Sequence, residues 1–218
     1  MKAASNRRND DKHERIIQAA IAVFAEKGFF HAKVSQIARR AGVADGTIYL
    51  YFKNKEDILI SIFEEKMEEV ITDMKEVLSG ESDAITKLKR FVHHHLLLVE
   101  RDPDLAEVFH IELRQSNKFM KAYVPVKFFE YLDLLSDLIV EGQRAGQIRK
   151  DVVPQIARRA IFGALDEISL RWVVARRAAR TEEGERYSEL QHPYSLEVTA
   201  EQVATLLIQG LTECEVKS

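Results

Sequence analysis

The chain has 218 residues, 46% of them hydrophobic and 31% charged, with only 9 glycines and 4 prolines. This composition predicts long helices with charged outer faces and excludes disordered, collagen-like and disulfide-rich proteins. No apolar run approaches the roughly 18 residues of a membrane span, and the polar start lacks the apolar core of a signal peptide, so we expect a cytoplasmic protein. The single cysteine, Cys214, cannot form an internal disulfide and has no neighbouring base, so we expect it to be inert.

Charge is distributed unevenly along the chain. Residues 1–55 contain 11 Lys or Arg and 5 Asp or Glu, a net charge of +6, whereas the remainder contains 21 and 30, a net charge of −9. Positive charge gathers on surfaces that bind nucleic acid. The asymmetry therefore favours a small nucleic-acid-binding module followed by a larger acidic body. A merely basic tail is the alternative, but the positive charge continues through Lys33, Arg39 and Lys53, inside segments that are expected to fold.

The N-terminal quarter has the pattern of three short helical segments. The segment from Asp11 to Lys27 has apolar residues at helical spacing, and Gly28 is expected to end this first helix. A second helix is expected over residues 34–41, closed by Gly42, and the run ADGTIYLYF follows it at once. Two short helices separated by a tight glycine-containing turn predict a helix-turn-helix.

The rest of the chain has the pattern of a helical body. A long amphipathic helix is expected from Asn54, as its N-cap, to about Leu78. Pro125 should start or kink its helix, and the polar stretch from Thr181 to Leu196 is expected to be a mobile loop. Because no alternating strand pattern is present, we expect an all-α fold. The other predicted helices span residues 82–101, 103–116, 119–145, 152–180 and 199–214.

A helix-turn-helix places its second helix in the major groove, so small residues are needed where its helices cross and polar residues at the exposed tip. Ala38, Ala41 and Gly42 permit the close crossing, and Gly46 lets the backbone approach the bases. Hydroxyl and ammonium groups beside the tip suit phosphate contacts. The expected DNA-binding residues are Lys33, Val34, Ala44, Asp45, Gly46, Thr47, Tyr49, Tyr51, Lys53 and Lys55.

The stretch GVADGTIYLYFKNKEDIL resembles the N-terminal signature of the TetR family of transcriptional regulators, and residues 13–60 follow that family's three-helix domain. The resemblance implies a DNA-binding domain at 1–55, a ligand-binding and dimerisation domain at 56–218, and a homodimer on a palindromic double-stranded operator. Two positions depart from the family, which usually has Thr and Ser where this chain has Lys33 and Ala44. Each departure removes a hydroxyl cap, typically worth about 1 kcal/mol.

Two further stretches, ELRQSN at 112–117 and IFGALDE at 161–167, look like the FadR-type members of that family, which control fatty-acid degradation genes. This resemblance implies a repressor that long-chain acyl-CoA releases from its operator, with acyl-CoA as effector and no cofactor. Such a ligand needs an apolar tunnel and cationic groups at its mouth. The candidate ligand-binding residues are Phe109, Glu112, Leu113, Arg114, Phe128, Leu132, Phe162, Asp166, Arg171 and Trp172, although ordinary core packing and structural ion pairs explain the same residue types.

The sequence leaves three alternative hypotheses to consider. The first is a TetR-type repressor of an efflux system that answers a hydrophobic drug. It would have the same DNA-binding module, but its ligand site would not need basic side chains to bind the phosphates of CoA. A small-molecule enzyme on a helical scaffold is disfavoured because no nucleophile elbow, phosphate loop or metal-hydrolase motif is present. A metal site at His93, His94 and His95 is disfavoured because adjacent helical positions point about 100° apart.

The dimer interface is expected on the last two long helices, although packing within one subunit could use the same residues. The residues concerned are Ala157, Ala160, Gly163, Ala164, Val203, Leu206, Leu207 and Leu211.

Overall fold

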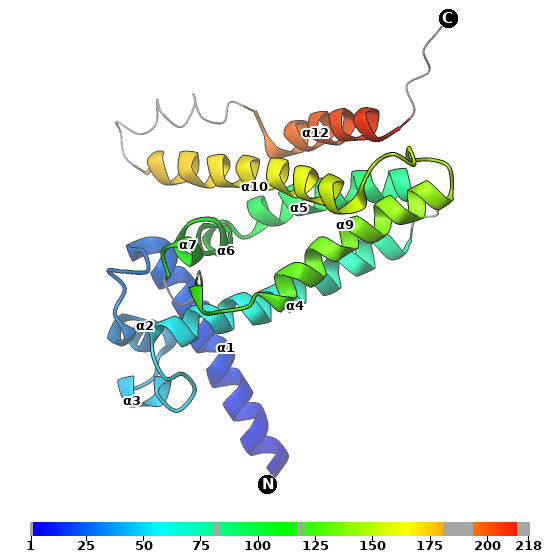
Figure 1. Cartoon of the computed structure of the whole chain (residues 1–218). Helices are drawn as coiled ribbons and strands as arrows, with labels where there is room; N and C mark the ends of the chain where they lie inside the picture. The colour runs from blue at the N-terminus through cyan, green and yellow to red at the C-terminus, as the bar shows by residue number, and fades with distance from the viewer. Residues whose placement is uncertain (1, 81–82, 117–118, 120, 181–193, 213–218) are drawn as a thin grey trace, which may run out of the picture. The chain divides into compact units, whose positions relative to one another are not determined.

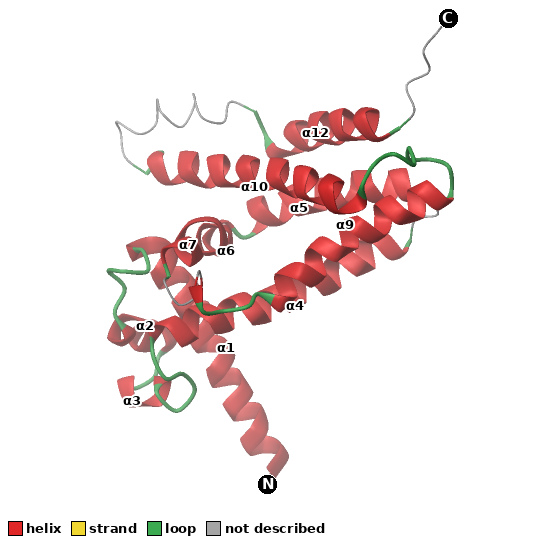
Figure 2. Ribbon diagram, in the orientation of Figure 1, coloured by secondary structure: helices red, strands yellow, loops and turns green. Residues whose placement is uncertain are grey.

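The structure is a computed structural model that describes residues 2–80, 83–116, 119, 121–180 and 194–212. The described residues form helices joined by short turns, with no strand among them (Figure 2). The expected all-α fold is confirmed. Within the described residues, no helix is both long enough and apolar enough to cross a membrane. Cys214 and residues 181–193 of the predicted loop lie outside the described residues.

The chain divides into two compact units that interleave along the sequence. The first unit consists of Met1–Lys66 and Asp104–Val124, and the second of Met67–Pro103 and Pro125–Ser218. The first unit therefore combines the N-terminal module with a segment that lies some way along the chain. Its described helices are α1 (Lys2–Lys27), α2 (Val34–Ala41), α3 (Asp45–Ile48), α6 (Pro103–Glu107, which the first unit includes from Asp104), the π-helix η1 (Val108–Glu112) and α7 (Leu113–Gln115).

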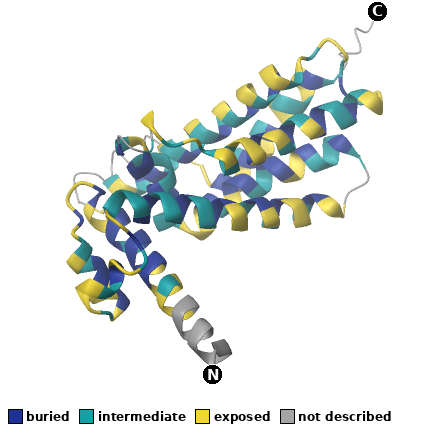
Figure 3. Cartoon of the chain, turned by 60° about the horizontal axis from the view of Figure 1, so that its bottom comes forward, coloured by how far each residue is buried: buried dark blue, intermediate teal, exposed yellow. Residues whose placement is uncertain are grey.

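The helix α4 (Lys55–Ser79) begins in the first unit and ends in the second. The other helices of the second unit are α5 (Ala84–Arg101), α9 (Val126–Arg144), α10 (Pro154–Ala178) and α12 (Leu196–Leu211). Within this unit α12 packs along α5, and α10 packs against α9 (Figure 1). Buried residues line the helix sides that face one another (Figure 3), as amphipathic helices require.

The helix ends follow local chemistry. The predicted N-cap of α4 is confirmed, because the Asn54 Oδ1 accepts the N–H of Asp57 at 2.9 Å. The carboxylate of Asp83 accepts the N–H of Thr86 at 2.9 Å and caps α5, and this bond lowers the pKa of Asp83. Ser195 caps α12 through the N–H of Val198. Each cap satisfies a backbone donor that the first helical turn leaves without an intrahelical partner.

Three predicted helices differ from the structure in their extent. The first begins at Lys2 rather than at Asp11, because the polar residues before Ile16 carry no apolar periodicity that could signal a helix. The helix predicted to start at residue 119 begins at Val126 instead. Pro125 directly precedes this helix. Because proline disfavours helical backbone in the residue before it, a helix cannot easily continue from residue 124 into this segment, and it starts after the proline instead. The last helix spans Leu196–Leu211 rather than 199–214.

The predicted helix over residues 103–116 also differs in its internal geometry. It is divided into α6, the π-helix η1 and α7. A π segment adds one residue to a helical turn, and it leaves the apolar residues at nearly helical spacing. The sequence pattern therefore predicted the helix without indicating its interruption.

We predict that Gly142→Ala destabilises the second unit. A Cβ at Gly142 would stand 2.6 Å from the Ile148 Cδ1 and 3.2 Å from the Ala84 Cβ, which is closer than packed carbon atoms approach. We expect the free energy of unfolding to fall by about 1–3 kcal/mol in urea denaturation. Ile148→Ala should relieve the clash, so the double variant should lose less stability than the two single losses added together. Strict additivity would contradict the proposed close contact.

Candidate nucleic-acid interface and effector region

The helix-turn-helix is built on an apolar core beneath α2 and α3. Ile37, Ala38 and Ala41 of α2 are buried, as is Ile48 of α3. Gly42 ends α2 with a φ of +66°, a left-handed conformation that favours glycine. The guanidinium of Arg15, on α1, donates to the carbonyls of Ala41 and Gly42 and so fixes the end of α2. The tight turn predicted at Gly42 therefore separates two short helices, as expected.

Most predicted DNA-binding residues lie on the exposed tip of this module. The exposed ones are Lys33, Ala44, Asp45, Gly46, Tyr49 and Lys53, whereas Val34, Thr47 and Tyr51 are partly buried. A Cβ at Gly46 would meet nothing within 4 Å. The backbone at the tip is therefore open to an approaching duplex, which is what the small residue was expected to provide.

The two missing hydroxyl caps have different outcomes. At the start of α2, the Gln36 Oε1 accepts the N–H of Lys33 at 2.9 Å, so a side chain of the first turn binds back to the capping residue. At the start of α3, Ala44 makes no side-chain capping bond. The bond from Gln36 thus partly replaces the cap that the family's Thr would supply before α2, whereas no side chain at residue 44 replaces the family's Ser before α3.

Lys55 contacts the backbone of its own module, and its predicted phosphate contact stays a prediction. Its ammonium donates to the carbonyls of Phe29 at 2.5 Å, Phe30 at 3.1 Å and Ala32 at 3.1 Å, and it lies 4.6 Å from the centroid of the Phe29 ring. These bonds use all three protons of the ammonium. Lys55 therefore orders the turn between α1 and α2 in this structure, because the carbonyls of that turn point toward the start of α4.

One residue of the tip was missed by sequence reasoning. Leu50 follows Tyr49 and is 82% exposed, more than any other large apolar side chain among the described residues. The sequence pattern assigned no role to Leu50. The signal that could have found it is the burial of Ile48 and Phe52, which leaves the residues between them on the outside of a helical turn.

The ten candidate ligand-binding residues are divided between the two units. Phe109, Glu112, Leu113 and Arg114 belong to the first unit, whereas Phe128, Leu132, Phe162, Asp166, Arg171 and Trp172 belong to the second. In the second unit, the rings of Phe128 and Phe162 are 5.0 Å apart. The Arg171 Nε is 2.6 Å from the Glu167 Oε1 on the same exposed helix face, which is the structural ion pair weighed against a ligand contact.

The first-unit members of that set are occupied by contacts within their own unit. Phe109 packs against Phe63 with ring centroids 5.4 Å apart, and Leu113 is buried. Glu112 is completely buried, and its Oε2 accepts the N–H of Phe29 at 2.6 Å. Arg114 is exposed. The Glu112 carboxylate thus binds the turn between α1 and α2. Helical periodicity does not reveal this contact, because 83 residues separate the two groups.

A buried polar pair in the second unit was also missed. The His95 Nδ1 and the Tyr131 hydroxyl are 2.8 Å apart, and both residues are buried among aromatic rings that include Phe91 and Phe162. Burial raises the pKa of the Tyr131 phenol, so the phenol stays protonated. The sequence pattern assigned no role to Tyr131, because helical periodicity does not indicate which residue of another helix a buried side chain will meet.

The three adjacent histidines reach three different helices. The His93 Nε2 is 3.1 Å from Glu201 on α12, the His94 Nε2 is 3.6 Å from Asp73 on α4, and His95 meets Tyr131 on α9. This divergence follows from the 100° step between helical positions. Burial also lowers the pKa of His94. Among the described residues, no group of three His, Cys, Asp or Glu is arranged to hold a metal ion.

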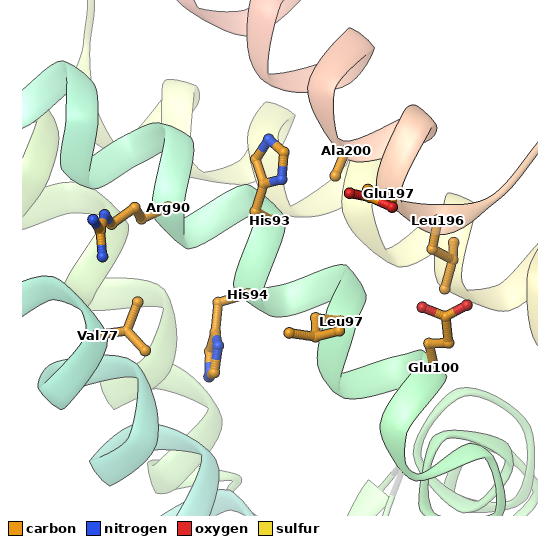
Figure 4. Close-up of a pocket in the computed structure, with 9 residues that line it drawn as sticks. All are labelled: Val77, Arg90, His93, His94, Leu97, Glu100, Leu196, Glu197 and Ala200. Atoms are coloured by element: carbon orange, nitrogen blue, oxygen red, sulfur yellow. The ribbon is translucent and has the colours of Figure 1, made fainter.

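A hollow of about 470 Å³ lies between α4, α5 and α12 (Figure 4). Arg90, His93 and His94 line it together with the carboxylates of Glu100 and Glu197, so charges of both signs face the same space. None of the ten candidate ligand-binding residues takes part in it. Its remaining lining residues are Val77, Leu97, Leu196 and Ala200.

Comparisons with known proteins cover almost the whole described chain. Residues 16–62 match the model of bacterial regulatory proteins of the tetR family, and residues 63–181 match the C-terminal region of YsiA-like proteins. A fatty acid metabolism regulator protein of Bacillus subtilis is 44% identical over 163 residues, which span 75% of this chain and 84% of that protein.

Two solved structures resemble the fold throughout. The fatty acid degradation regulator FadR from Bacillus halodurans aligns with a TM-score of 0.79 and 39% identity, over 92% of this chain and 96% of that one. The transcriptional regulator FadR from Bacillus subtilis, solved in complex with stearoyl-CoA, aligns with a TM-score of 0.78 and 39% identity, over 91% and 98%. With an N-terminal helix-turn-helix, an all-helical body and these matches, this chain belongs to the TetR family of bacterial transcriptional regulators.

Proposed function

We propose that this chain is a DNA-binding repressor that controls fatty-acid degradation genes and is released from its operator by long-chain acyl-CoA. The observation that carries the proposal is the 44% identity to a fatty acid metabolism regulator, over 84% of that protein's length. The similarity to a structure that holds stearoyl-CoA supports the effector class. A regulator that binds chromosomal DNA acts in the cytoplasm, and this role calls for neither a cofactor nor catalysis.

The DNA side of the proposal rests on the exposed tip of the helix-turn-helix. We assign residues 1–55 to DNA binding, with Ala44, Asp45, Gly46 and Thr47 at the tip that meets the bases. The proposed phosphate contacts come from Lys33, Tyr49, Tyr51, Lys53 and Lys55, and Val34 lies beside Lys33 at the start of α2. The open space around Gly46 and the exposure of Tyr49 support this assignment. The net charge of +6 over these residues favours association with a polyanion.

The effector side of the proposal rests on residues 56–218. Phe128, Leu132, Phe162 and Trp172 supply apolar surface for an acyl chain, and Asp166 and Arg171 lie on the same long helix as Phe162. The buried pair of His95 and Tyr131 adds hydrogen-bonding capacity among these aromatic rings. An apolar lining with a few placed polar groups is what a ligand with a long tail and a thioester requires.

A homodimer on a palindromic operator completes the proposal, because one helix-turn-helix reads only a short half-site. The exposed faces of α10 and α12 support it. Leu206 is 68% exposed and Ile156 is 65% exposed, and Ala160 and Gly163 form a small-residue surface on α10. Ala157 and Leu211 are instead buried within the subunit, so only part of the predicted face is available to a partner.

We predict that Tyr51→Phe and Gly46→Leu both weaken operator binding in fluorescence anisotropy titrations. Loss of the Tyr51 hydroxyl removes one phosphate contact, so the Kd should rise roughly threefold to tenfold on any operator sequence. A leucine at residue 46 fits within the protein, where a Cβ meets nothing within 4 Å, but it should hold the duplex away and raise the Kd more than about tenfold. Unchanged melting temperatures serve as the control. Wild-type affinity in both variants would contradict this docking.

We predict that long-chain acyl-CoA stabilises the purified protein. Ligand at about 100 times its Kd adds roughly 2.7 kcal/mol, which corresponds to a rise in Tm of about 5–10 °C for a chain of this length. Differential scanning fluorimetry should compare stearoyl-CoA with stearate, CoA and a hydrophobic cationic drug. Stabilisation by stearoyl-CoA above all three supports the acyl-CoA effector. A response to the drug alone would instead indicate the repressor of an efflux system.

We predict that Leu206→Glu dissociates the dimer. A carboxylate in the centre of an apolar interface is desolvated without a partner, which costs several kcal/mol. Light scattering should give twice the mass of one chain for the wild type and a single mass for the variant, and operator affinity should fall with it. Phe129→Glu changes another exposed apolar residue, on α9, and is expected to remain dimeric. A dimeric Leu206→Glu variant would exclude this face.

A further inference from the structure

A buried carboxylate from the middle of the chain holds the backbone of the DNA-reading module. Glu112 has no exposed surface, and its Oε2 accepts the N–H of Phe29 at 2.6 Å. The side-chain amide of Gln115 donates to the same oxygen at 3.2 Å. Gly28, whose φ is +76°, lies so close that a Cβ there would stand 3.7 Å from the Glu112 Oε2. A charge-assisted hydrogen bond in such surroundings is among the stronger contacts in proteins.

The turn that Glu112 binds is the one that positions the start of α2. Lys55 donates to three carbonyls of this turn, whereas Glu112 accepts from the N–H of Phe29. The turn therefore lies between an ammonium on its carbonyl side and a carboxylate on its amide side. It leads directly into Lys33 and Val34, where the proposed phosphate contacts begin. Any displacement of the turn displaces these contacts, since α2 follows it without a flexible linker.

The segment that carries Glu112 belongs to the DNA-reading unit but is connected at both ends to the other unit. Asp104–Val124 clusters with Met1–Lys66, whereas α5 before it and α9 after it belong to the second unit. An aromatic cluster secures the segment to the first half of α4. The rings of Phe109, Phe119 and Tyr123 all lie within 6.2 Å of Phe63. The segment therefore forms a direct covalent link from the helices that carry the proposed effector residues.

The local helix geometry makes the Glu112 contact sensitive to small movements. Glu112 is the last residue of the π-helix η1, Val108–Glu112. A π turn holds one residue more than the α-helical hydrogen-bonding pattern accommodates, and such turns recur at functional sites. Conversion to α-helical register rotates the residues that follow by about 100° relative to those before it. Such a rotation carries the Glu112 carboxylate away from the Phe29 amide.

We propose that Glu112 is a positioning residue for operator binding, through which the effector-side helices α5 and α9 control the helix-turn-helix. With the carboxylate on Phe29, the turn and the start of α2 are held for DNA contact. When the segment shifts, the bond breaks, the turn relaxes and operator affinity falls. The effector half of this inference rests on the proposed acyl-CoA response, whereas the positioning half requires only that the chain binds DNA.

Two substitutions at Glu112 test separately whether operator binding depends on the length of this side chain or on its negative charge. Glu112→Gln keeps an oxygen within reach of the Phe29 amide but loses the charge, whereas Glu112→Asp keeps the charge but retracts it by about 1.5 Å. We expect the operator Kd of the ligand-free protein to rise at least about fivefold for Glu112→Asp, and less for Glu112→Gln. Ile17→Val, which removes one buried methylene from α1, is the control for general destabilisation. Its operator Kd should stay closer to the wild-type value than that of a Glu112 variant with the same loss of Tm.

A second readout distinguishes positioning from a purely structural role. The ratio of operator Kd values with and without stearoyl-CoA should be at least about fivefold in the wild type and in Ile17→Val, and it should fall toward one in Glu112→Asp. Hydrogen exchange of the wild-type protein gives the direct test without any substitution. Peptides covering residues 29–33 should exchange faster when stearoyl-CoA is bound, because the Phe29 amide loses its acceptor.

The outcomes separate this inference from the proposed function. If the wild type binds its operator and responds to stearoyl-CoA, but the Glu112 variants keep the wild-type Kd and the wild-type ratio, the inference is overturned and the function stands. Unchanged hydrogen exchange at residues 29–33 in the liganded wild type overturns the effector half. If the wild type does not respond to stearoyl-CoA, the proposed effector is wrong, and the ligand-free Kd of Glu112→Asp alone decides the positioning half.

Discussion

The hydrogen bonds on the turn between α1 and α2 set the position of the DNA-reading face. The N–H of Phe29 points to the carboxylate of Glu112, and the carbonyls of Phe29, Phe30 and Ala32 point to the ammonium of Lys55. A buried carboxylate that loses its hydrogen-bond donors is costly, and so is a buried amide that loses its acceptor. The module therefore includes the segment Asp104–Val124 as a structural part, although that segment follows α5 in the sequence.

The crossing of α1 and α2 depends on a second charged contact of the same kind. Arg15 donates to the last carbonyls of α2, which an isolated helix leaves exposed at its C-terminus. A Cβ at Gly42 would stand 2.9 Å from this guanidinium, so glycine serves both the left-handed turn and the close approach. The exposed tip can thus be made of small residues with little packing of their own, because the helices beneath it are fixed from behind.

In the second unit, the apolar interior also holds a buried polar contact between α5 and α9. His95 and Tyr131 bind each other within a ring of aromatic side chains, while the neighbouring His93 and His94 turn outward to carboxylates on α12 and α4. Three consecutive histidines thereby link α5 to three other helices. Packing within this unit leaves apolar residues exposed on α10 and α12, among them Ile156 and Leu206.

The sequence by itself determined the helices, the caps and the identity of the reading motif, because these depend on residues close together in the chain. Apolar spacing placed α2, α4 and α5, Asn54 capped α4 as predicted, and Pro125 set the start of α9. Only the tertiary structure decided the roles of Glu112 and Lys55, the exposure of Leu50 and the pairing of His95 with Tyr131. The bond between Glu112 and Phe29 joins groups 83 residues apart, and helical periodicity assigns a residue to a face without naming the distant backbone group that the face will meet.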